Sequence, residues 1–400
     1  MPPRHIDPQL SSLAMQRGTR ELRGARIGLR TRELPFDASC AGPPWGRLWR
    51  LGAMGPRRPE GVVPSSYVQS YSGRVMGLNH STLFLNRDAV EAVRLPMSTI
   101  IELVEQGLIE KAMGRVQMPP KHWMERDNER WFGGMSSLVP KFGYTAMKWQ
   151  SGSDENAARG LPYLTGLLFL NSLEDGLVAA VMDSTWITQQ RTAAASAVAV
   201  KHLANPDAPS FGVLGAGVQA RSHLEALTHV MPHLKEVLIY DINPQAADAF
   251  AEVVRAAGFT PVIVSSARAI FDQTSVLISC GRIKANVERP VDADWIKPGL
   301  TAVAIDYDCY WKPAGLRAID CLLTDDLGQI EHIKAYNYFV DSPPFRGELG
   351  DVAAGIAKGR VSASDSIAVM NMGVAVEDVG AAKAIFEAAK ARGLGQRLDL

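Results

Sequence analysis

The sequence predicts an α/β protein with a doubly wound parallel sheet, joined to a second domain of the α+β class. Short apolar strands alternate with helices across residues 188–334, and this order is typical of parallel sheets covered by helices on both faces. Across residues 82–182, neighbouring strands are instead joined by short turns, which indicates an antiparallel or mixed sheet. With 400 residues, 46% of them hydrophobic and 21% charged, the chain is long enough for two globular domains.

Residues 1–75 are predicted to be an arginine-rich, poorly ordered extension. The first 60 residues contain eleven arginines, five acids and no lysine, and thus carry a net charge of +6. A nucleic-acid-binding arm and a transit peptide are the alternatives for such a stretch. We favour the extension, with no nucleic-acid partner, because no aromatic or folded motif accompanies the charge.

The α+β domain is predicted from residues 76–187 and 335–400. A helix begins near Ser98, where Ile100, Ile101, Val104 and Leu108 form an apolar stripe. A long C-terminal helix over Val376–Arg392 ends at Gly393. The predicted strands are Leu83–Leu85, Met135–Val139, Thr145–Trp149, Thr165–Leu170 and Leu177–Met182.

The parallel domain is predicted from residues 188–334 and begins with the alanine-rich helix Thr188–Leu203. A helix over Gln219–His229 follows the first strand, and the next helix is capped by Asn243, with Pro244 at its first position and Gly258 after its last turn. The predicted strands are Ser210–Leu214, Val237–Tyr240, Pro261–Val264, Ser275–Ser279 and Thr301–Ile305.

A GxGxxA run joins the first strand of this domain to its helix, and comprises Gly215, Ala216, Gly217, Val218, Gln219 and Ala220. The first glycine permits a tight turn, the second lets a pyrophosphate approach the backbone, and the alanine lets the helix pack closely on the sheet. The N-terminus of that helix supplies N–H groups and a positive dipole end to phosphates. The run therefore predicts a Rossmann-type dinucleotide site.

Asp241 ends the next strand, where an acid can accept hydrogen bonds from both ribose hydroxyls. Its charge would repel a 2′-phosphate, and no arginine follows at Ile242 or Asn243. NAD is therefore predicted as the cofactor rather than NADP. The alternative is that Asp241 only begins the turn before the helix capped by Asn243.

Five polar residues accompany these domains: Lys121, Lys148, Arg191, Asp308 and Lys312. Lys148 stands inside a strand-like run, and Asp308 and Lys312 follow the carboxyl end of a predicted parallel strand, where open α/β sheets bind ligands. Taken singly, each lysine is explained as a solvated surface charge.

The order of these residues resembles the ornithine cyclodeaminase/mu-crystallin family from about Thr82 to the C-terminus. The segments that carry the resemblance are Gln117–Lys121, Lys148, Asn156 with Gly160–Pro162, Arg191–Ala194, Gly215–Ala220, Pro298–Gly299 with Asp308 and Lys312, Gly347–Val352 and Gly373–Asp378. The resemblance implies an NAD-dependent enzyme acting on the α C–N bond of an amino or imino acid. It also implies a homodimer in which the 76–187 and 335–400 domain binds substrate and forms the interface.

Carried over by position, Lys121 and Arg191 would clamp a substrate carboxylate, and Lys148 would donate or relay a proton. Asp308 would be the general base, and Lys312 would keep it ionised and touch the cofactor. Ser137 stands where ornithine-specific members place an acid, so a substrate other than ornithine is expected. A net dehydrogenase or ketimine reductase and a mu-crystallin-like NAD(P)-binding protein are the alternatives.

The remaining expectations concern location and metals. Leu161–Val181 is the most apolar stretch, and Asn171, Glu174 and Asp175 interrupt it, so no membrane span or membrane partner is predicted. Four cysteines without CxxC spacing, and no signal peptide, indicate free thiols in a cytoplasmic protein. No metal site is predicted.

Overall fold

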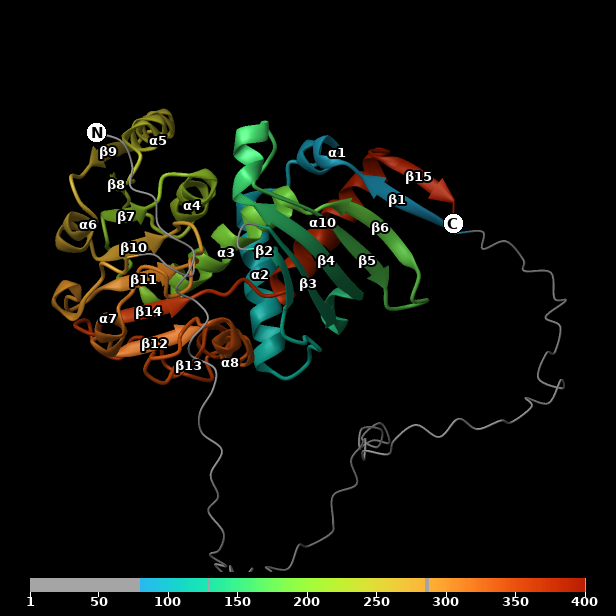
Figure 1. Ribbon diagram of the computed structural model, residues 1–400. Coiled ribbons are helices and arrows are strands. Elements are labelled where there is room, and N and C mark those ends of the chain that lie inside the picture. Colours follow the sequence, from blue (N-terminus) through green and yellow to red (C-terminus); the bar gives the residue numbers. More distant parts are fainter. Residues whose placement is uncertain (1–79, 128–129, 285–287, 400) are drawn as a thin grey trace, which may run out of the picture. The chain divides into compact units, whose positions relative to one another are not determined.

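The computed structural model describes residues 80–127, 130–284 and 288–399. The predicted extension over residues 1–75, with Cys40, lies outside this part. The described residues form two sheets, one mixed and one parallel (Figure 1). The Rossmann-type parallel sheet and the accompanying α+β domain are thus both present, as predicted.

The mixed sheet has seven strands in the order β15-β1-β6-β5-β4-β3-β2. Along the chain these are β1 (Ser81–Leu85), β2 (His122–Asp127), β3 (Arg130–Val139), β4 (Tyr144–Ser153), β5 (Leu164–Ser172), β6 (Val178–Asp183) and β15 (Gln396–Asp399). Strands β2 to β6 pair antiparallel with one another in chain order, while β1 pairs parallel with β6. The two strands predicted within 135–149 are present, and each is ten residues long, which is longer than predicted. The turn between them ends at Gly143, whose backbone is in the left-handed region.

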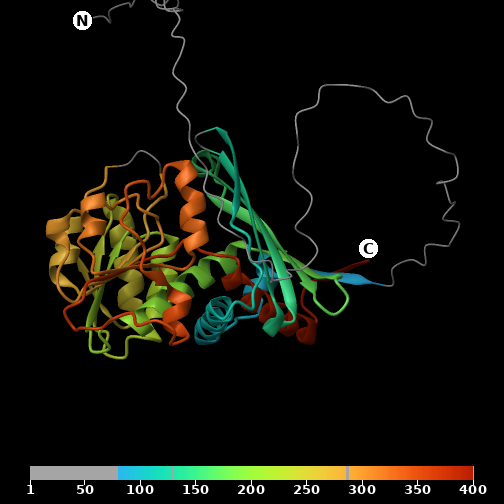
Figure 2. The ribbon, with the colours of Figure 1, turned by 90° about the horizontal axis from the view of Figure 1, so that it is seen from below.

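Helices α1 (Arg87–Ala92), α2 (Met97–Ala112) and α10 (Val376–Arg392) belong to the mixed-sheet part, and α10 lies against β3, β4 and β5 (Figure 2). The apolar stripe predicted for α2 is buried, including Ile100, Val104 and Leu108. The α10 helix ends at Gly393, whose φ of 66° is the left-handed conformation that glycine adopts readily. The predicted end of the C-terminal helix at Gly393 is therefore confirmed.

The parallel sheet has eight strands in the order β13-β12-β14-β11-β10-β7-β8-β9. The strands are β7 (Ser210–Leu214), β8 (Glu236–Tyr240), β9 (Thr260–Ile263), β10 (Val276–Ser279), β11 (Thr301–Ala304), β12 (Cys321–Thr324), β13 (Gly347–Glu348) and β14 (Ile367–Met370). The helices along this part are α4 (Val218–Thr228), α5 (Pro244–Ala256), α6 (Ala267–Gln273), α7 (Pro313–Arg317), α8 (Leu327–Ile333) and α9 (Leu349–Ala353).

Both faces of the parallel sheet are buried. In β8, Val237 and Ile239 belong to one hydrophobic cluster while Leu238 between them belongs to another. Val369 and Met370 of β14 divide between the two clusters in the same way. Side chains of a strand alternate between faces, so a sheet covered on both sides needs apolar residues at every position.

Helix α3 (Thr185–Leu203) contacts elements of both parts of the fold. It lies against α2 and α10 of the mixed-sheet part and against α4 and β11 of the parallel part. Its buried alanines, among them Ala193, Ala194 and Ala197, let these neighbours approach closely. A side chain on α3 can therefore meet residues from either part.

The domain division differs from the prediction at its C-terminal boundary. Strands β13 and β14 lie within the predicted 335–400 segment, yet they pair in the parallel sheet, with β14 between β12 and β11. Only after β14 does the chain return to the mixed-sheet part through α10. In the described residues no helix is long and apolar enough to cross a membrane, and Cys280, Cys309 and Cys321 are unpaired.

Candidate active site

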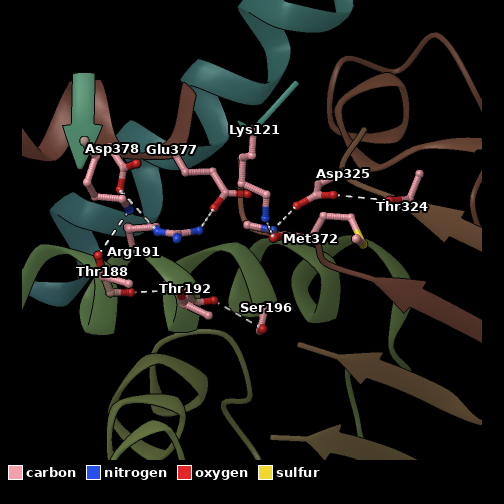
Figure 3. Close-up of polar contacts among 12 residues, drawn as sticks. Lys121, Thr188, Arg191, Thr192, Ser196, Thr324, Asp325, Met372, Glu377 and Asp378 are labelled. Atoms are coloured by element: carbon pink, nitrogen blue, oxygen red, sulfur yellow. Dashed lines mark hydrogen bonds and ion pairs between the residues drawn. The ribbon is translucent and has the colours of Figure 1, made fainter. Parts of the chain in front are cut away.

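Six ionisable side chains from separate parts of the chain lie together beside the N-terminus of α10, and all of them except Lys148 are labelled in Figure 3. We call them the buried ionic cluster, and they are Lys121, Lys148, Arg191, Asp325, Glu377 and Asp378. All except Lys121, which is partly exposed, are at most 5% exposed. The fold thus brings together three cations that the sequence predicted as site residues.

Lys148 lies on β4, near the middle of the mixed sheet, and is 1% exposed. Its Nζ donates hydrogen bonds to Asp378 Oδ1 at 2.8 Å and to Thr188 Oγ1 at 3.1 Å. Burial and the nearby charge of Arg191 lower the pKa of Lys148 to about 8, against the opposing effect of Asp378. An amine with this pKa can give up and regain a proton near neutral pH, which is compatible with the predicted relay.

Arg191 projects from α3 toward α10. Its Nη1 donates to Glu377 Oε2 at 2.5 Å, and its Nε lies 3.2 Å from Asp378 Oδ1. Burial opposes its charge, but Asp378 and Glu377 raise the pKa of Arg191 above the usual value. A Cβ at Gly373 would stand 2.6 Å from Nη1, so the guanidinium depends on this glycine for space.

Lys121 precedes β2 and connects the buried ionic cluster to the end of β11. Its Nζ donates to the Met372 carbonyl at 2.5 Å and to the Tyr307 hydroxyl at 3.4 Å. Burial lowers the pKa of Lys121 to about 8, although the charge of Asp325 opposes this shift. The ammonium therefore lies beside the residue that immediately precedes Asp308.

Asp308 follows β11 and is 2% exposed. Its Oδ2 accepts hydrogen bonds from Arg289 Nη1 at 2.7 Å and from the Phe339 amide at 3.1 Å. Its Oδ1 is buried and has no hydrogen-bond partner in the described chain. Burial raises the pKa of Asp308 more than the Arg289 charge lowers it. Tyr307 and Phe339 both adopt positive φ, 59° and 55°, and strained residues of this kind cluster at functional sites.

The role predicted for Lys312 at Asp308 is wrong. Lys312 is about half exposed, and its Nζ donates to Asp292 Oδ2 at 2.7 Å. Side chains four residues apart meet on a helix, but Lys312 is the extended residue before α7, and a turn separates it from Asp308. The cation beside Asp308 is Arg289, which was not predicted from the sequence.

The glycine-rich loop has the geometry predicted from its sequence. Gly215 has φ of 97°, and a Cβ there would stand 2.8 Å from the Cys280 carbonyl oxygen. At Gly217 a Cβ would meet nothing within 4 Å, so this backbone faces open space. Gly217 is also the N-cap of α4, and no side chain caps that helix, whereas Asn243 caps α5. The first amides of α4 thus remain available for phosphate oxygens.

Hydrogen bonds join this loop to the end of β11. Cys280 Sγ, just after β10, donates to the Gly215 carbonyl at 3.0 Å. Asp306 then accepts from Ser279 Oγ at 2.5 Å and from the Gly281 amide at 2.8 Å. The cofactor loop, the β10 end and the turn that carries Asp308 therefore share one carboxyl edge of the parallel sheet.

The remaining predicted cofactor residues lie around the same loop. Asp241, after β8, accepts from the Ala216 amide at 2.7 Å and from the Asn243 amide at 2.7 Å. Val218 is exposed at the first turn of α4, and Gln219 keeps its buried Oε1 without a hydrogen-bond partner in the described chain. An open glycine backbone, an uncapped helix and an acid at the next strand end together fit a dinucleotide.

Four charged residues at the site escaped the sequence analysis: Asp325, Glu377, Asp378 and Arg289. Glu377 and Asp378 stand within the motif that carried the family resemblance, so their position was visible although their role was not. Asp378 bonds to a residue 230 positions away in the chain, and no local periodicity reports such a pairing. Within the described residues, no group of three or more His, Cys, Asp or Glu side chains could hold a metal.

Comparison with known proteins agrees with this architecture. The model of the ornithine cyclodeaminase/mu-crystallin family matches residues 80–393. The alanine dehydrogenase of Archaeoglobus fulgidus is 31% identical over 330 residues, which cover 79% of this chain and 98% of the relative.

Two solved structures share the fold. An archaeal alanine dehydrogenase dimer with bound NAD superposes with a TM-score of 0.71 at 29% identity, covering 80% of this chain and 99% of its own. The Thermococcus litoralis Δ1-pyrroline-2-carboxylate reductase, in complex with NADH and L-proline, gives a TM-score of 0.70 at 30% identity, covering 79% of this chain and 100% of its own. This chain belongs to the ornithine cyclodeaminase/mu-crystallin family.

Proposed function

We propose that this protein is an NAD-dependent enzyme that acts on the α C–N bond of an amino acid or imino acid. The observation that carries the proposal is the convergence of Lys121, Lys148 and Arg191 in one buried cluster, connected through Tyr307 to Asp308. Fixed cations suit a substrate carboxylate, and a buried acid suits proton transfer at the adjacent nitrogen. An alanine dehydrogenase and a pyrroline-2-carboxylate reductase each align with 79% of this chain.

The substrate carboxylate would bind to the cations of the cluster. Arg191 is the planar donor that can hold both carboxylate oxygens, and its Nη2 makes no hydrogen bond among the described residues. Lys121 adds an ammonium beside Tyr307 and thereby orients the α-carbon toward the edge of the parallel sheet. The two groups together fix one end of the substrate.

Asp308 would then serve as the acid/base group. Its unpartnered Oδ1 can accept a proton from the substrate amine or from the water that attacks an iminium carbon, and can return it in the reverse direction. Arg289 holds Oδ2 and so directs Oδ1. Bound NAD supplies the hydride acceptor or, when reduced, the hydride donor.

Net oxidoreduction is favoured over hydride-recycling deamination. Ser137 is 1% exposed and its hydroxyl has no hydrogen-bond partner in the described chain, so no carboxylate stands at this position to hold a distal ammonium such as that of ornithine. A binding protein without catalysis would have no use for Asp308. A cyclodeaminase remains the second candidate because the family contains such enzymes.

The cofactor is proposed to be NAD rather than NADP. Asp241 lies against the Ala216 amide at the end of β8, and its negative charge would repel a 2′-phosphate. Ile242, the next residue, is 91% exposed and offers no cation for such a phosphate.

A homodimer is proposed through the outer face of the mixed sheet. Met147 on β4 lies opposite Phe169 on β5, and Leu167 stands two residues before Phe169 on the same strand. All three side chains are 36–41% exposed, and Phe132 on β3 is exposed as well. An apolar sheet face of this kind is suited to a second copy of the chain, and the archaeal alanine dehydrogenase is described as a dimer.

The test is a substrate screen that measures NADH absorbance and ammonia together. L-Alanine, L-proline and L-ornithine are assayed with NAD, and pyruvate with ammonia and Δ1-pyrroline-2-carboxylate are assayed with NADH. We expect matched changes in NADH and product with an amino or imino acid other than ornithine. Ammonia release without net change in NADH would instead support the cyclodeaminase, and no reaction with any of these compounds would contradict the proposal.

A further inference from the structure

The buried ionic cluster contains as many acids as cations. When all six groups are ionised, Lys121, Lys148 and Arg191 contribute three positive charges, and the three acids contribute three negative charges. Arg191 and Lys148 are already paired, with Glu377 Oε2 at 2.5 Å and Asp378 Oδ1 at 2.8 Å. Two of the three cations are therefore already neutralised by acids of the cluster.

A substrate carboxylate adds a fourth negative charge to this buried region. An uncompensated buried charge is costly, because the interior replaces little of the lost hydration. Electrical balance is restored if one of the three acids takes up a proton as the carboxylate enters. The question is which acid can accept it.

The hydrogen bonds distinguish the three acids. Asp378 lies between Lys148 and the Nε of Arg191, both within 3.2 Å. Asp325 accepts from the Gly373 amide at 2.7 Å and from Thr324 Oγ1 at 3.2 Å, so both of its oxygens are hydrogen-bonded. Glu377 contacts one cation, Arg191, and its Oε1 is buried without a hydrogen bond in the described chain, as is Asp378 Oδ2. Glu377 is thus the acid that the cluster holds least strongly.

The charges facing Glu377 support this choice. Around it lie Arg191 from α3, Lys148 from β4, Lys121 before β2, Asp325 after β12 and Asp378 on its own helix. Burial raises the pKa of Glu377 to about 7, against the lowering effect of Arg191, and Asp325 and Asp378 raise it further. A carboxyl of this kind exchanges its proton at neutral pH.

We propose that Glu377 takes up one proton from solvent when a substrate carboxylate binds, and so releases Arg191 Nη1 to the substrate. This inference rests on the proposed function. No covalent bond forms or breaks, since the proton moves from water or buffer to a Glu377 carboxylate oxygen. Glu377 is then a positioning residue that makes substrate binding stronger at low pH.

The first test is calorimetry on the wild-type protein saturated with NADH. The probe is pyrrole-2-carboxylate, a planar anion with no ammonium group, titrated at pH 7 in buffers of different ionisation enthalpy. We expect uptake of roughly half a proton per bound anion, because a carboxyl with a pKa near 7 is half protonated beforehand. Lys121 and Lys148, with pKa values of about 8, are mostly charged at pH 7 and contribute little.

The second test is the variant Glu377→Gln, whose neutral side chain has nearly the shape of the protonated acid. In the wild type, the Kd for pyrrole-2-carboxylate should rise about tenfold from pH 6 to pH 8 through this group. The variant should bind with wild-type affinity at pH 6 and about tenfold more tightly than wild type at pH 8. The matched control Glu387→Gln, at an exposed site on the same helix, should behave as wild type.

The outcomes separate the two proposals. Binding of the anion without proton uptake overturns the role of Glu377 and leaves the proposed function intact. Equal weakening of binding at every pH in Glu377→Gln shows a merely structural role and also overturns it. If none of pyrrole-2-carboxylate, L-alanine, pyruvate and L-proline binds, the proposed function is wrong, and this inference is wrong as well. Should Glu377→Gln not fold, the wild-type proton count still decides.

Discussion

At the scale of single residues, Asp308 is a buried carboxylate in which one oxygen is hydrogen-bonded and the other is not. Arg289 and the Phe339 amide hold Oδ2, and Oδ1 has no hydrogen-bond partner in the described part of the chain. Such an arrangement fixes the carboxylate plane while leaving an acceptor for a substrate proton. Tyr307 and Phe339, on either side of this carboxylate, both adopt left-handed backbone, which the surrounding structure must hold in place.

Asp308→Asn should lower turnover by about 10²–10⁴, because the amide cannot accept a proton. NADH affinity, measured by fluorescence titration, should stay within twofold of wild type. Asp292→Asn, which removes an exposed acid from the same part of the chain, serves as the control and should keep normal turnover. Near-normal activity of Asp308→Asn would refute the assignment.

Arg289→Gln should shift the pH–rate profile. Arg289 lowers the pKa of Asp308 against the effect of burial, so its removal lets that pKa rise. The base must be ionised to act, and the fall of kcat/KM on the acid side should therefore begin at a pH about one unit higher. Lys312→Gln, which loses only its bond to Asp292, should leave the profile unchanged. If Lys312→Gln shifted the profile and Arg289→Gln did not, the role first predicted for Lys312 would be supported instead.

At the scale of elements, the two glycines of the glycine-rich loop have different roles: Gly217 leaves space for the cofactor, and Gly215 also permits a tight turn. Gly217→Ala should weaken NADH binding about tenfold with an unchanged Tm, because its Cβ points into the open space that a pyrophosphate requires. Gly215→Ala should also lower stability by about 1–2 kcal/mol, since φ is 97° and the Cβ would press on the Cys280 carbonyl. Titration and thermal melts on both variants check this contrast, and equal Tm losses would contradict it.

Elements with strong local signals were predicted well from the sequence. The α5 helix begins after its Asn243 cap and α10 ends at Gly393, as expected from capping chemistry. Strands β12 and β14, of four residues each, were missed, although β10 and β11 of the same length were predicted. The Rossmann loop needed only local sequence, whereas the partners of Arg191 and Asp308 depend on pairings that the tertiary fold creates.

At the scale of the whole molecule, the apolar face of the mixed sheet predicts self-association. Met147→Asp should convert a dimer to monomers in light scattering after gel filtration, because a carboxylate would be buried opposite Phe169 and its copy. Val361→Asp, at an exposed apolar site outside the mixed sheet, should leave the assembly unchanged. A monomeric wild type, or a dimeric Met147→Asp, would exclude this face as the interface.

The late return of the chain through β14 and α10 has a consequence for synthesis on the ribosome. Strand β14 pairs on both sides inside the parallel sheet, and α10 covers β3, β4 and β5 of the mixed sheet. The parallel sheet lacks β14 until residue 370 has been translated, and the mixed sheet lacks β15 until residue 399, so neither part can complete its fold before the C-terminal segment is made. Until then Lys148 and Arg191 lack the two acids of α10, and the nascent chain carries these cations without their buried partners.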